Sequence, residues 1–264
     1  MSFSDFGLAA LAVFTLMNIT SFFAIQKRRN DFADVIWGPG FLLSGIALLL
    51  FKIKFSDGFE VNDRKLCILV LTAIWALRLF LHIGVRNLKK PDEDARYLKM
   101  RRSWGDEWRS KSYTRVFILQ GAIMLVIALP IYITISSPSV PLDYWSAIAI
   151  AIWLFGFVVE SLADQQLSVF VKDPSKKGKI MSSGLWSWSR HPNYFGEIVQ
   201  WWGIFLLSLP VGQAWISVLS PIGITFMILK ISGVTMLENQ MRDRPGYKEY
   251  QAKTSQFFLW PPKK

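Results

Sequence analysis

The chain has 264 residues, and hydrophobic residues make up 52% of them, in runs that approach the roughly 20 apolar residues needed to cross a bilayer. The formal net charge of +11 could suggest nucleic-acid binding, but basic cytoplasmic loops are the commoner cause in a membrane protein. A single cysteine, Cys67, excludes an intramolecular disulfide framework and a cysteine metal cluster. We therefore expect an all-α, polytopic membrane protein that forms a single membrane domain over residues 1–264.

The hydrophobic runs predict about seven transmembrane helices along the chain. The first run has no basic segment before it and no cleavage-site pattern after it, so we expect a retained span rather than a signal peptide. The predicted spans are residues 6–25, 35–53, 66–85, 116–136, 144–168, 197–209 and 212–237.

The basic residues alternate between the connections of these spans. Lys and Arg are dense after the first, third, fifth and seventh spans and sparse after the second, fourth and sixth. Because cytoplasmic loops are enriched in Lys and Arg, this pattern predicts an N-terminus outside and a C-terminus in the cytoplasm. It also explains the net charge without a nucleic-acid partner.

Asp34 opens the second predicted span, in the sequence DVIWGPG. An acidic residue at a helix start often serves as a cap and interacts favourably with the helix dipole. A catalytic role for Asp34 is the alternative.

Two pairs of ionisable residues fall inside predicted spans, where a charge is costly and indicates a functional site by default. Arg78 and His82 share one face of the third span and could meet a phosphate or a carboxylate. Glu160 and Asp164 repeat this spacing in the fifth span and could receive hydroxyl or amide groups. Each pair could instead neutralise an opposite charge within the protein.

The stretch GLWSWSRHPNYFGE, residues 184–197, places polar groups directly before the sixth span. Its glycine and proline interrupt a continuous helix, and such backbone is tolerated near a membrane where it lines a polar cavity. Arg190, His191 and Asn193 offer directed donors, and arginine suits phosphate in particular. Interfacial anchoring would explain the tryptophans but not this polar set, so the stretch favours ligand binding.

With these residues in view, the sequence resembles bacterial membrane proteins of the steroid 5-alpha-reductase-like family. That group is an uncharacterised family with a 3-oxo-5-alpha-steroid 4-dehydrogenase-like C-terminal domain, and it is more distantly similar to sterol reductases and isoprenylcysteine carboxyl methyltransferases. The resemblance is strongest over residues 145–262. It rests on GLWSWSRHPNYFGE, ESLADQQLSVFVKDP and ENQMRDRPGYKEYQAKTSQFFLWPP.

The resemblance implies that the two halves of the chain have different roles and that one of them binds a cofactor. Residues 1–140, with four spans, would be the substrate-side half, and residues 141–264, with three spans and a cytoplasmic tail, would bind NADPH. The location would be the bacterial inner membrane. The positions that match the family's cofactor motif are Asp164, Lys172, Arg190, His191, Asn193, Tyr194, Gly196 and Glu197, followed by Glu238, Arg242, Tyr247 and Tyr250.

The reaction that the resemblance implies is NADPH-dependent reduction of a C=C bond conjugated to a carbonyl, in a steroid- or isoprenoid-like substrate that enters from the bilayer. Steroid 5-alpha-reductases polarise the carbonyl with a tyrosine in a His-Tyr-x-x-Arg context. Here that context reads HIGVR, and Ile83 replaces the tyrosine. The remaining catalytic candidates are Asp34, Arg78 and His82, and the proton donor stays open.

Two other functions are compatible with the sequence. RHPNYFGE and the later glutamate and tyrosines also resemble the methyltransferase branch, which implies methyl transfer from S-adenosylmethionine. Because that cofactor has no phosphate, the basic residues near the motif favour NADPH. A lipid-binding membrane protein without activity is the third possibility. We expect membrane lipids and a lipophilic small molecule as partners, no metal and no nucleic acid, and leave the oligomeric state open.

Overall fold

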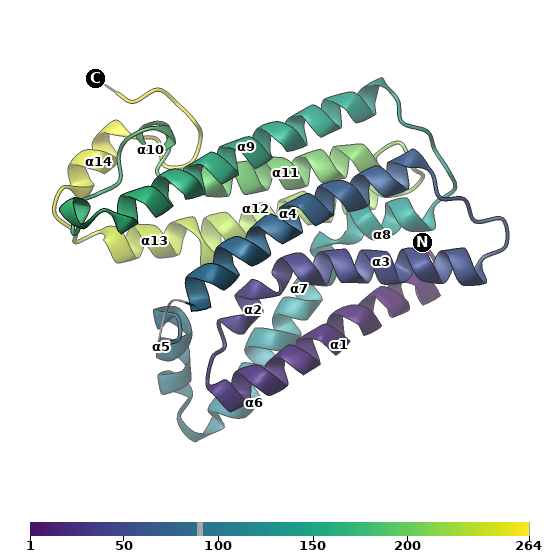
Figure 1. Cartoon of the computed structure of the whole chain (residues 1–264), viewed down its shortest axis with the longest axis horizontal. Helices are drawn as coiled ribbons and strands as arrows, with labels where there is room; N and C mark the ends of the chain where they lie inside the picture. The colour runs from purple at the N-terminus through teal and green to yellow at the C-terminus, as the bar shows by residue number, and fades with distance from the viewer. Residues whose placement is uncertain (89–91, 264) are drawn as a thin grey trace. The chain divides into compact units, whose positions relative to one another are not determined.

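The computed structural model describes residues 1–88 and 92–263, and all regular secondary structure in this part of the chain is helical (Figure 1). An isolated bridge between Ser189 and Ser255 is the one β-type pairing in the described residues. The predicted all-α class is therefore confirmed. The chain divides into two compact units, each built from two segments of the sequence.

Unit 1 comprises Met1–Leu142 and Ser208–Leu219. In it α3 packs against α1 and α4, and α8 packs against α3 and α4. The second segment contains the 3-10 turn η4, and Val211 and Ala214 of this segment pack against Ile133 of α8. Its elements are α1 (Phe3–Lys27), α2 (Phe32–Val35), α3 (Trp37–Phe55), α4 (Asp63–Leu88), α5 (Ala95–Trp104), η1 (Gly105–Glu107), α6 (Trp108–Ser112), η2 (Tyr113–Ile118), α7 (Leu119–Ile127), α8 (Leu129–Ser136) and η4 (Ala214–Val218).

Unit 2 comprises Asp143–Leu207 and Ser220–Lys264. Its long first helix starts at a capping box, in which Asp143 and Ser146 satisfy each other's backbone N–H groups. Its elements are α9 (Tyr144–Lys172), η3 (Pro174–Lys176), α10 (Leu185–Trp188), α11 (Pro192–Ser208), α12 (Leu219–Phe226), η5 (Met227–Ser232), α13 (Val234–Met241) and α14 (Tyr247–Lys253).

Five helical segments are long and apolar enough to cross a membrane, and a sixth is added if one bent pair counts as a span. The five are Phe3–Lys27, Trp37–Phe55, Asp63–Asn87, Tyr144–Lys172 and Ala214–Met241. Helix α11, which contains the predicted span 197–209, has 17 residues and is not among them.

The bent pair replaces the straight fourth span predicted at 116–136. Ala95–Ile127 and Leu129–Ser136 meet at 52°. Pro130 lies in the first turn of α8, where its missing N–H costs no hydrogen bond but where it prevents α7 from continuing. Pro130 therefore explains the bend, which the mean hydropathy of the segment does not predict.

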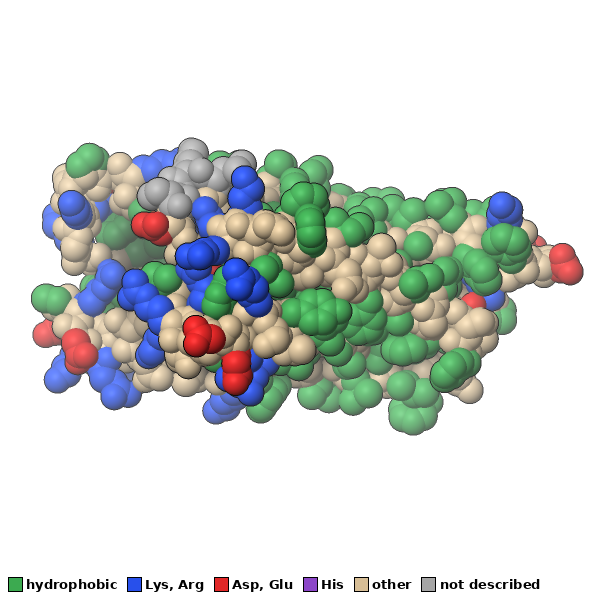
Figure 2. Space-filling view, turned by 90° about the horizontal axis from the view of Figure 1, so that it is seen from below, with side chains coloured by type: hydrophobic (Ala, Val, Ile, Leu, Met, Phe, Trp, Pro, Cys, Tyr) green, Lys and Arg blue, Asp and Glu red, His purple; other side chains and the backbone are tan. Residues whose placement is uncertain are grey.

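The surface agrees with a membrane location. Large apolar side chains stand exposed along the long helices, among them Leu11, Phe22 and Leu50 in unit 1 and Phe155 in unit 2. On the face drawn in Figure 2, hydrophobic side chains cover a broad area. In water such a surface would drive aggregation, and in a bilayer it faces lipid.

Helices α9 and α11 approach each other closely because glycines lie at their contact. A Cβ on Gly156 would lie 2.6 Å from the carbonyl oxygen of Gly196, and one on Gly196 would lie 2.6 Å from the backbone nitrogen of Glu160. Further along, Gly203 meets Trp153 in the same way. Small residues at this contact let two backbones pack without a side chain between them.

This contact makes a stability prediction. Gly156→Ala would force a methyl group into backbone atoms of α11, so we expect the free energy of unfolding to fall by about 1–3 kcal/mol. Gly223→Ala is the matched control, since a Cβ on this helical glycine meets nothing within 4 Å. Denaturant unfolding of the purified chain in detergent measures both. Equal stability of the two variants would contradict the close approach.

Candidate functional site

The stretch 184–197 folds as a short helix, a bend and the start of a long helix. Gly184 has a φ of 61°, and a Cβ there would collide with the amide of Gln166. That amide accepts a hydrogen bond from the backbone N–H of Leu185 at 3.0 Å. The bend ends at Pro192, the first residue of α11. This geometry presents Arg190 and the residues after it at the N-terminal end of α11.

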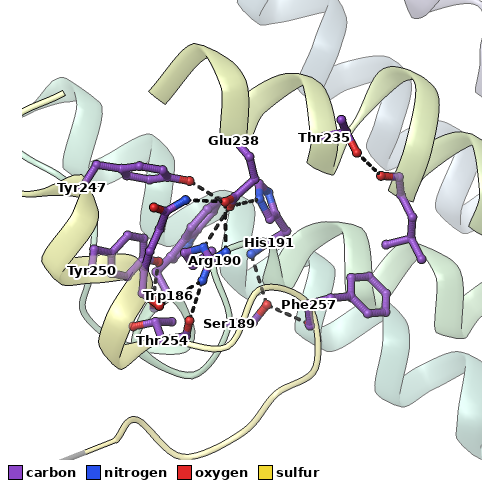
Figure 3. Close-up of polar contacts among 12 residues, drawn as sticks. Trp186, Ser189, Arg190, His191, Thr235, Glu238, Tyr247, Tyr250, Thr254 and Phe257 are labelled. Carbon is purple, nitrogen blue, oxygen red and sulfur yellow. Dashed lines mark hydrogen bonds and ion pairs between the residues drawn. The ribbon is translucent and has the colours of Figure 1, made fainter. Parts of the chain in front are cut away.

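Glu238, on α13, is the centre of the polar cluster that forms there (Figure 3). Its Oε1 accepts from Arg190 Nε at 2.8 Å and from the Tyr247 hydroxyl at 2.8 Å, and lies 2.9 Å from His191 Nε2. Its Oε2 accepts from Arg190 Nη2 at 2.9 Å and from Gln251 Nε2 at 2.8 Å. One carboxylate of α13 thus joins the bend before α11 to α14.

The remaining donors of Arg190 are also engaged. Nη1 donates to the carbonyl oxygen of Thr254 at 2.7 Å, and the backbone N–H donates to that of Ser255 at 2.8 Å. Burial alone would lower the pKa of Arg190, but its bonds with Glu238 raise it above the ordinary value. Arg190 therefore stays charged, and it fastens the C-terminal segment to α11.

Aromatic side chains enclose this cluster. Burial and the neighbouring Glu238 carboxylate raise the pKa of Tyr247, so its hydroxyl stays a donor. Tyr250 donates to the carbonyl oxygen of Trp186 at 2.5 Å. His191 stacks on Tyr194 with ring centroids 5.8 Å apart and planes within 17°. The polar groups of Tyr247 and Tyr250 thus each have a hydrogen-bond partner.

A second polar contact involves Asn193 and Asp164. The Asn193 side-chain nitrogen donates to Asp164 Oδ1 at 3.1 Å, which ties α11 to α9. The Asn193 oxygen Oδ1 is buried and has no hydrogen-bond partner within the described chain. A buried acceptor without a partner costs about 1–3 kcal/mol, so a ligand donor at this position would be favourable.

The other predicted cofactor residues lie apart from this core. Lys172 is exposed at the end of α9, and Arg242 is exposed and donates to Asn239 at 3.1 Å. Glu197 is partly buried in α11. Gly196 lies at the contact with α9, which gives it a packing role in addition to any role at a ligand.

The three catalytic candidates all belong to unit 1. Arg78 and His82 lie on α4 and are partly buried. Asp34 lies in α2 and makes no cap bond to α3, which begins at Trp37. Asp34 therefore does not cap the second span through its side chain, and its carboxylate has other partners.

Those partners come from α5. Asp34 Oδ2 accepts from Arg96 Nη2 at 2.8 Å, and Oδ1 accepts from the Tyr97 hydroxyl at 2.5 Å. Tyr97 in turn accepts from Gln120, whose oxygen accepts from Trp37 Nε1 at 2.7 Å. Burial raises the pKa of Asp34 although Arg96 opposes the shift. The chain thus offers an acid and a tyrosine in direct contact.

No pattern in the sequence indicates Tyr97 directly. It lies in the segment EDARYLKMRRSWG, which hydropathy treats as a basic cytoplasmic connection. A tyrosine between arginines could have been flagged as a polar group with an anionic neighbour, but only the fold identifies that neighbour as Asp34. Gln251 and Thr254, which complete the Glu238 cluster, were likewise not anticipated. Within the described residues, no group of three or more His, Cys, Asp or Glu could hold a metal ion.

The Glu238 cluster makes a second stability prediction. The side chains of Arg190 and Glu238 are only 9% and 12% exposed, so Glu238→Ala leaves a buried guanidinium without its counter-charge. We expect a loss of about 3–5 kcal/mol in unfolding free energy, and faster proteolysis of the segment after residue 241.

The matched control is Glu107→Ala. Glu107 also forms an ion pair, with Lys111 at 2.6 Å, but its side chain is 67% exposed. Exposed pairs contribute little, so no measurable change is expected. Two variants of equal stability and equal protease sensitivity would show that the Glu238 cluster does not hold the C-terminal segment.

Comparison with known proteins identifies a family but no activity. An uncharacterised protein of the fission yeast Schizosaccharomyces pombe, C594.04c, is 24% identical over an alignment that covers 97% of this chain and 80% of the yeast protein. No solved structure matches. Residues 22–254 match the family described as Protein of unknown function (DUF1295). The chain therefore belongs to the DUF1295 family.

Proposed function

We propose that this protein is an NADPH-dependent membrane reductase that acts on a C=C bond conjugated to a carbonyl in a lipophilic, steroid- or isoprenoid-like molecule of lipid metabolism. The observation that carries the proposal is the buried Asn193 Oδ1 without a partner, beside Asp164 in unit 2. A nicotinamide carries a carboxamide N–H₂, which is the kind of donor that this oxygen lacks.

The residues of unit 2 fit such a cofactor in part. Asn193 and Asp164 would hold its amide or hydroxyl groups. Arg190 is already bonded to Glu238, so the phosphates would depend on exposed cations such as Lys172 and Arg242. When bound, NADPH supplies hydride to the carbon of the C=C bond far from the carbonyl.

The other half of the reaction needs a proton. We assign it to Tyr97. Its hydroxyl contacts Asp34, whose charge Arg96 balances, and a positioned acid of this kind typically accelerates a reaction 10²–10⁴-fold. Tyr97 would protonate the carbon next to the carbonyl and recover its proton from water, while Arg78 and His82 stay candidates for stabilising the enolate charge.

The finer membrane assignment is part of the same proposal. Seven crossings would require α11 and the bent pair to span in addition to the five long helices. The loop charges would then place the N-terminus outside and the tail in the cytoplasm, where NADPH is available. The location would be the inner membrane of a bacterium. Residues 1–140 would serve the substrate and residues 141–264 the cofactor.

One observation favours a different function. Because Glu238 and backbone carbonyls occupy the donors of Arg190, the cluster lacks a free guanidinium for phosphate. A cofactor without phosphate, S-adenosylmethionine, would not need one. The protein would then be a membrane methyltransferase of the isoprenylcysteine carboxyl methyltransferase type.

Cofactor binding separates the two functions. NADPH and S-adenosylmethionine are titrated into the purified chain, with binding followed by calorimetry. We expect NADPH to bind, and Asn193→Ala to weaken it about tenfold through the loss of one buried hydrogen bond. Asn18→Ala, an exposed asparagine of unit 1, is the control and should bind normally. Binding of S-adenosylmethionine alone would favour the methyltransferase, and binding of neither would favour a lipid-binding protein without activity.

The proton donor has its own test. Tyr97→Phe removes the hydroxyl, so we expect kcat for NADPH oxidation with a 3-oxo steroid enone to fall at least ~100-fold, with NADPH affinity unchanged. Tyr113→Phe alters an exposed hydroxyl that contacts Asn18 and should leave kcat intact. Equal rates for the two variants would remove Tyr97 from the mechanism, and a wild-type protein that reduces no enone would contradict the reductase.

A further inference from the structure

Unit 2 contains a groove of about 440 Å³ that the polar cluster does not use. Phe195 and Trp202 of α11 line it together with Phe257 and Phe258 of the C-terminal segment. Thr235 and Lys230 contribute its polar groups. This volume lies within the range of small-molecule sites, which are largely apolar with a few placed polar groups.

Lys230 is the unusual member of this lining. It lies inside Ala214–Met241, a segment long and apolar enough to cross a membrane. Within the described residues, no carboxylate lies within ion-pair distance of its ammonium group. A charged side chain at such a position is costly and indicates a functional site by default, with an anion as the expected partner.

The backbone around Lys230 is distorted. Met227–Ser232 forms the π-helical segment η5, and a Cβ on the following Gly233 would lie 2.5 Å from the carbonyl oxygen of Ile228. The Thr235 hydroxyl donates across this break to the carbonyl oxygen of Leu229 at 2.7 Å (Figure 3). Single π-helical turns within α-helices are rare and frequent at functional sites. Here the turn lies in the wall of the groove and contains its cation.

The C-terminal segment that lines the groove is held in place. Ser189 donates to the carbonyl oxygen of Phe257 at 2.8 Å, and Trp260 donates from its backbone N–H to that of Trp188 at 3.1 Å. Phe195 contacts both Phe257 and Phe258 edge to face. The backbone of this segment is therefore bonded to the stretch 184–197, and its phenylalanines contact Phe195.

We propose that this groove binds an anionic single-chain lipid, with its carboxylate at Lys230 and its hydrocarbon chain against Phe195, Trp202 and Phe258. Charge complementarity selects the head, since the lining supplies one cation. The aromatic walls select the chain. This site needs no cofactor and no catalytic residue, so it stands or fails independently of the reductase.

Photo-crosslinking tests the site directly. The purified full-length chain in detergent is labelled with a palmitate that carries a diazirine in its chain, and the adducts are mapped by mass spectrometry. We expect labelling of residues 195–202 and 256–258. The corresponding fatty alcohol, which lacks the carboxylate, should bind about tenfold more weakly.

Variants of the lysine complete the design. Lys230→Gln should weaken palmitate about tenfold and leave the alcohol unchanged, while Lys230→Arg should retain palmitate. Lys54→Gln, an exposed lysine of unit 1, is the matched control and should bind as the wild type does. Excess acetate should not displace palmitate, because it lacks the chain. Labelling elsewhere, equal affinity for acid and alcohol, or an unaffected Lys230→Gln variant would overturn the proposal.

Discussion

The ion pair between Arg190 and Glu238 is the interaction on which unit 2 depends. Both side chains are nearly buried, and the carboxylate receives donors from the bend before α11 and from α14. Removing two charges from water is expensive, and a well-packed apolar pair could be equally stable. We interpret the pair as a positional constraint, because its geometry allows only one placement of the C-terminal segment over the start of α11.

That constraint changes the meaning of the polar stretch 184–197. Arginine in such a stretch suggests a phosphate ligand, but the guanidinium of Arg190 donates its hydrogen bonds to Glu238 and Thr254. The groups left for a ligand are the Asn193 oxygen and the exposed cations. A ligand at this site would therefore be recognised first through an amide or hydroxyl and only peripherally through charge. Arg190 holds the C-terminal segment against the bend that precedes Asn193.

The C-terminal segment contributes both to the Glu238 cluster and to the apolar groove. Its backbone completes the Glu238 cluster, and its phenylalanines form a wall of the apolar groove. A polar site and a hydrophobic site thus share one structural support in unit 2. In unit 1 the Tyr97 hydroxyl donates a hydrogen bond to the Asp34 carboxylate, which Arg96 also contacts. A glutamine and a tryptophan fix the tyrosine from the other side.

The sequence by itself determined the helical class, the apolar segments and the polar stretch, since these are local properties. Hydropathy predicted helices such as Phe3–Lys27 and Tyr144–Lys172 to within a few residues. It missed the bend before Pro130, because a mean over many residues is hardly changed by a single proline. Only the tertiary structure decided which polar groups meet. Glu238 finds Arg190 across 48 residues of sequence, and Tyr97 finds Asp34 across 63. Such contacts depend on how the helices pack. Glycines such as Gly156 allow two helix backbones to approach closely, and the hydrophobic periodicity of the sequence does not predict which glycines do so.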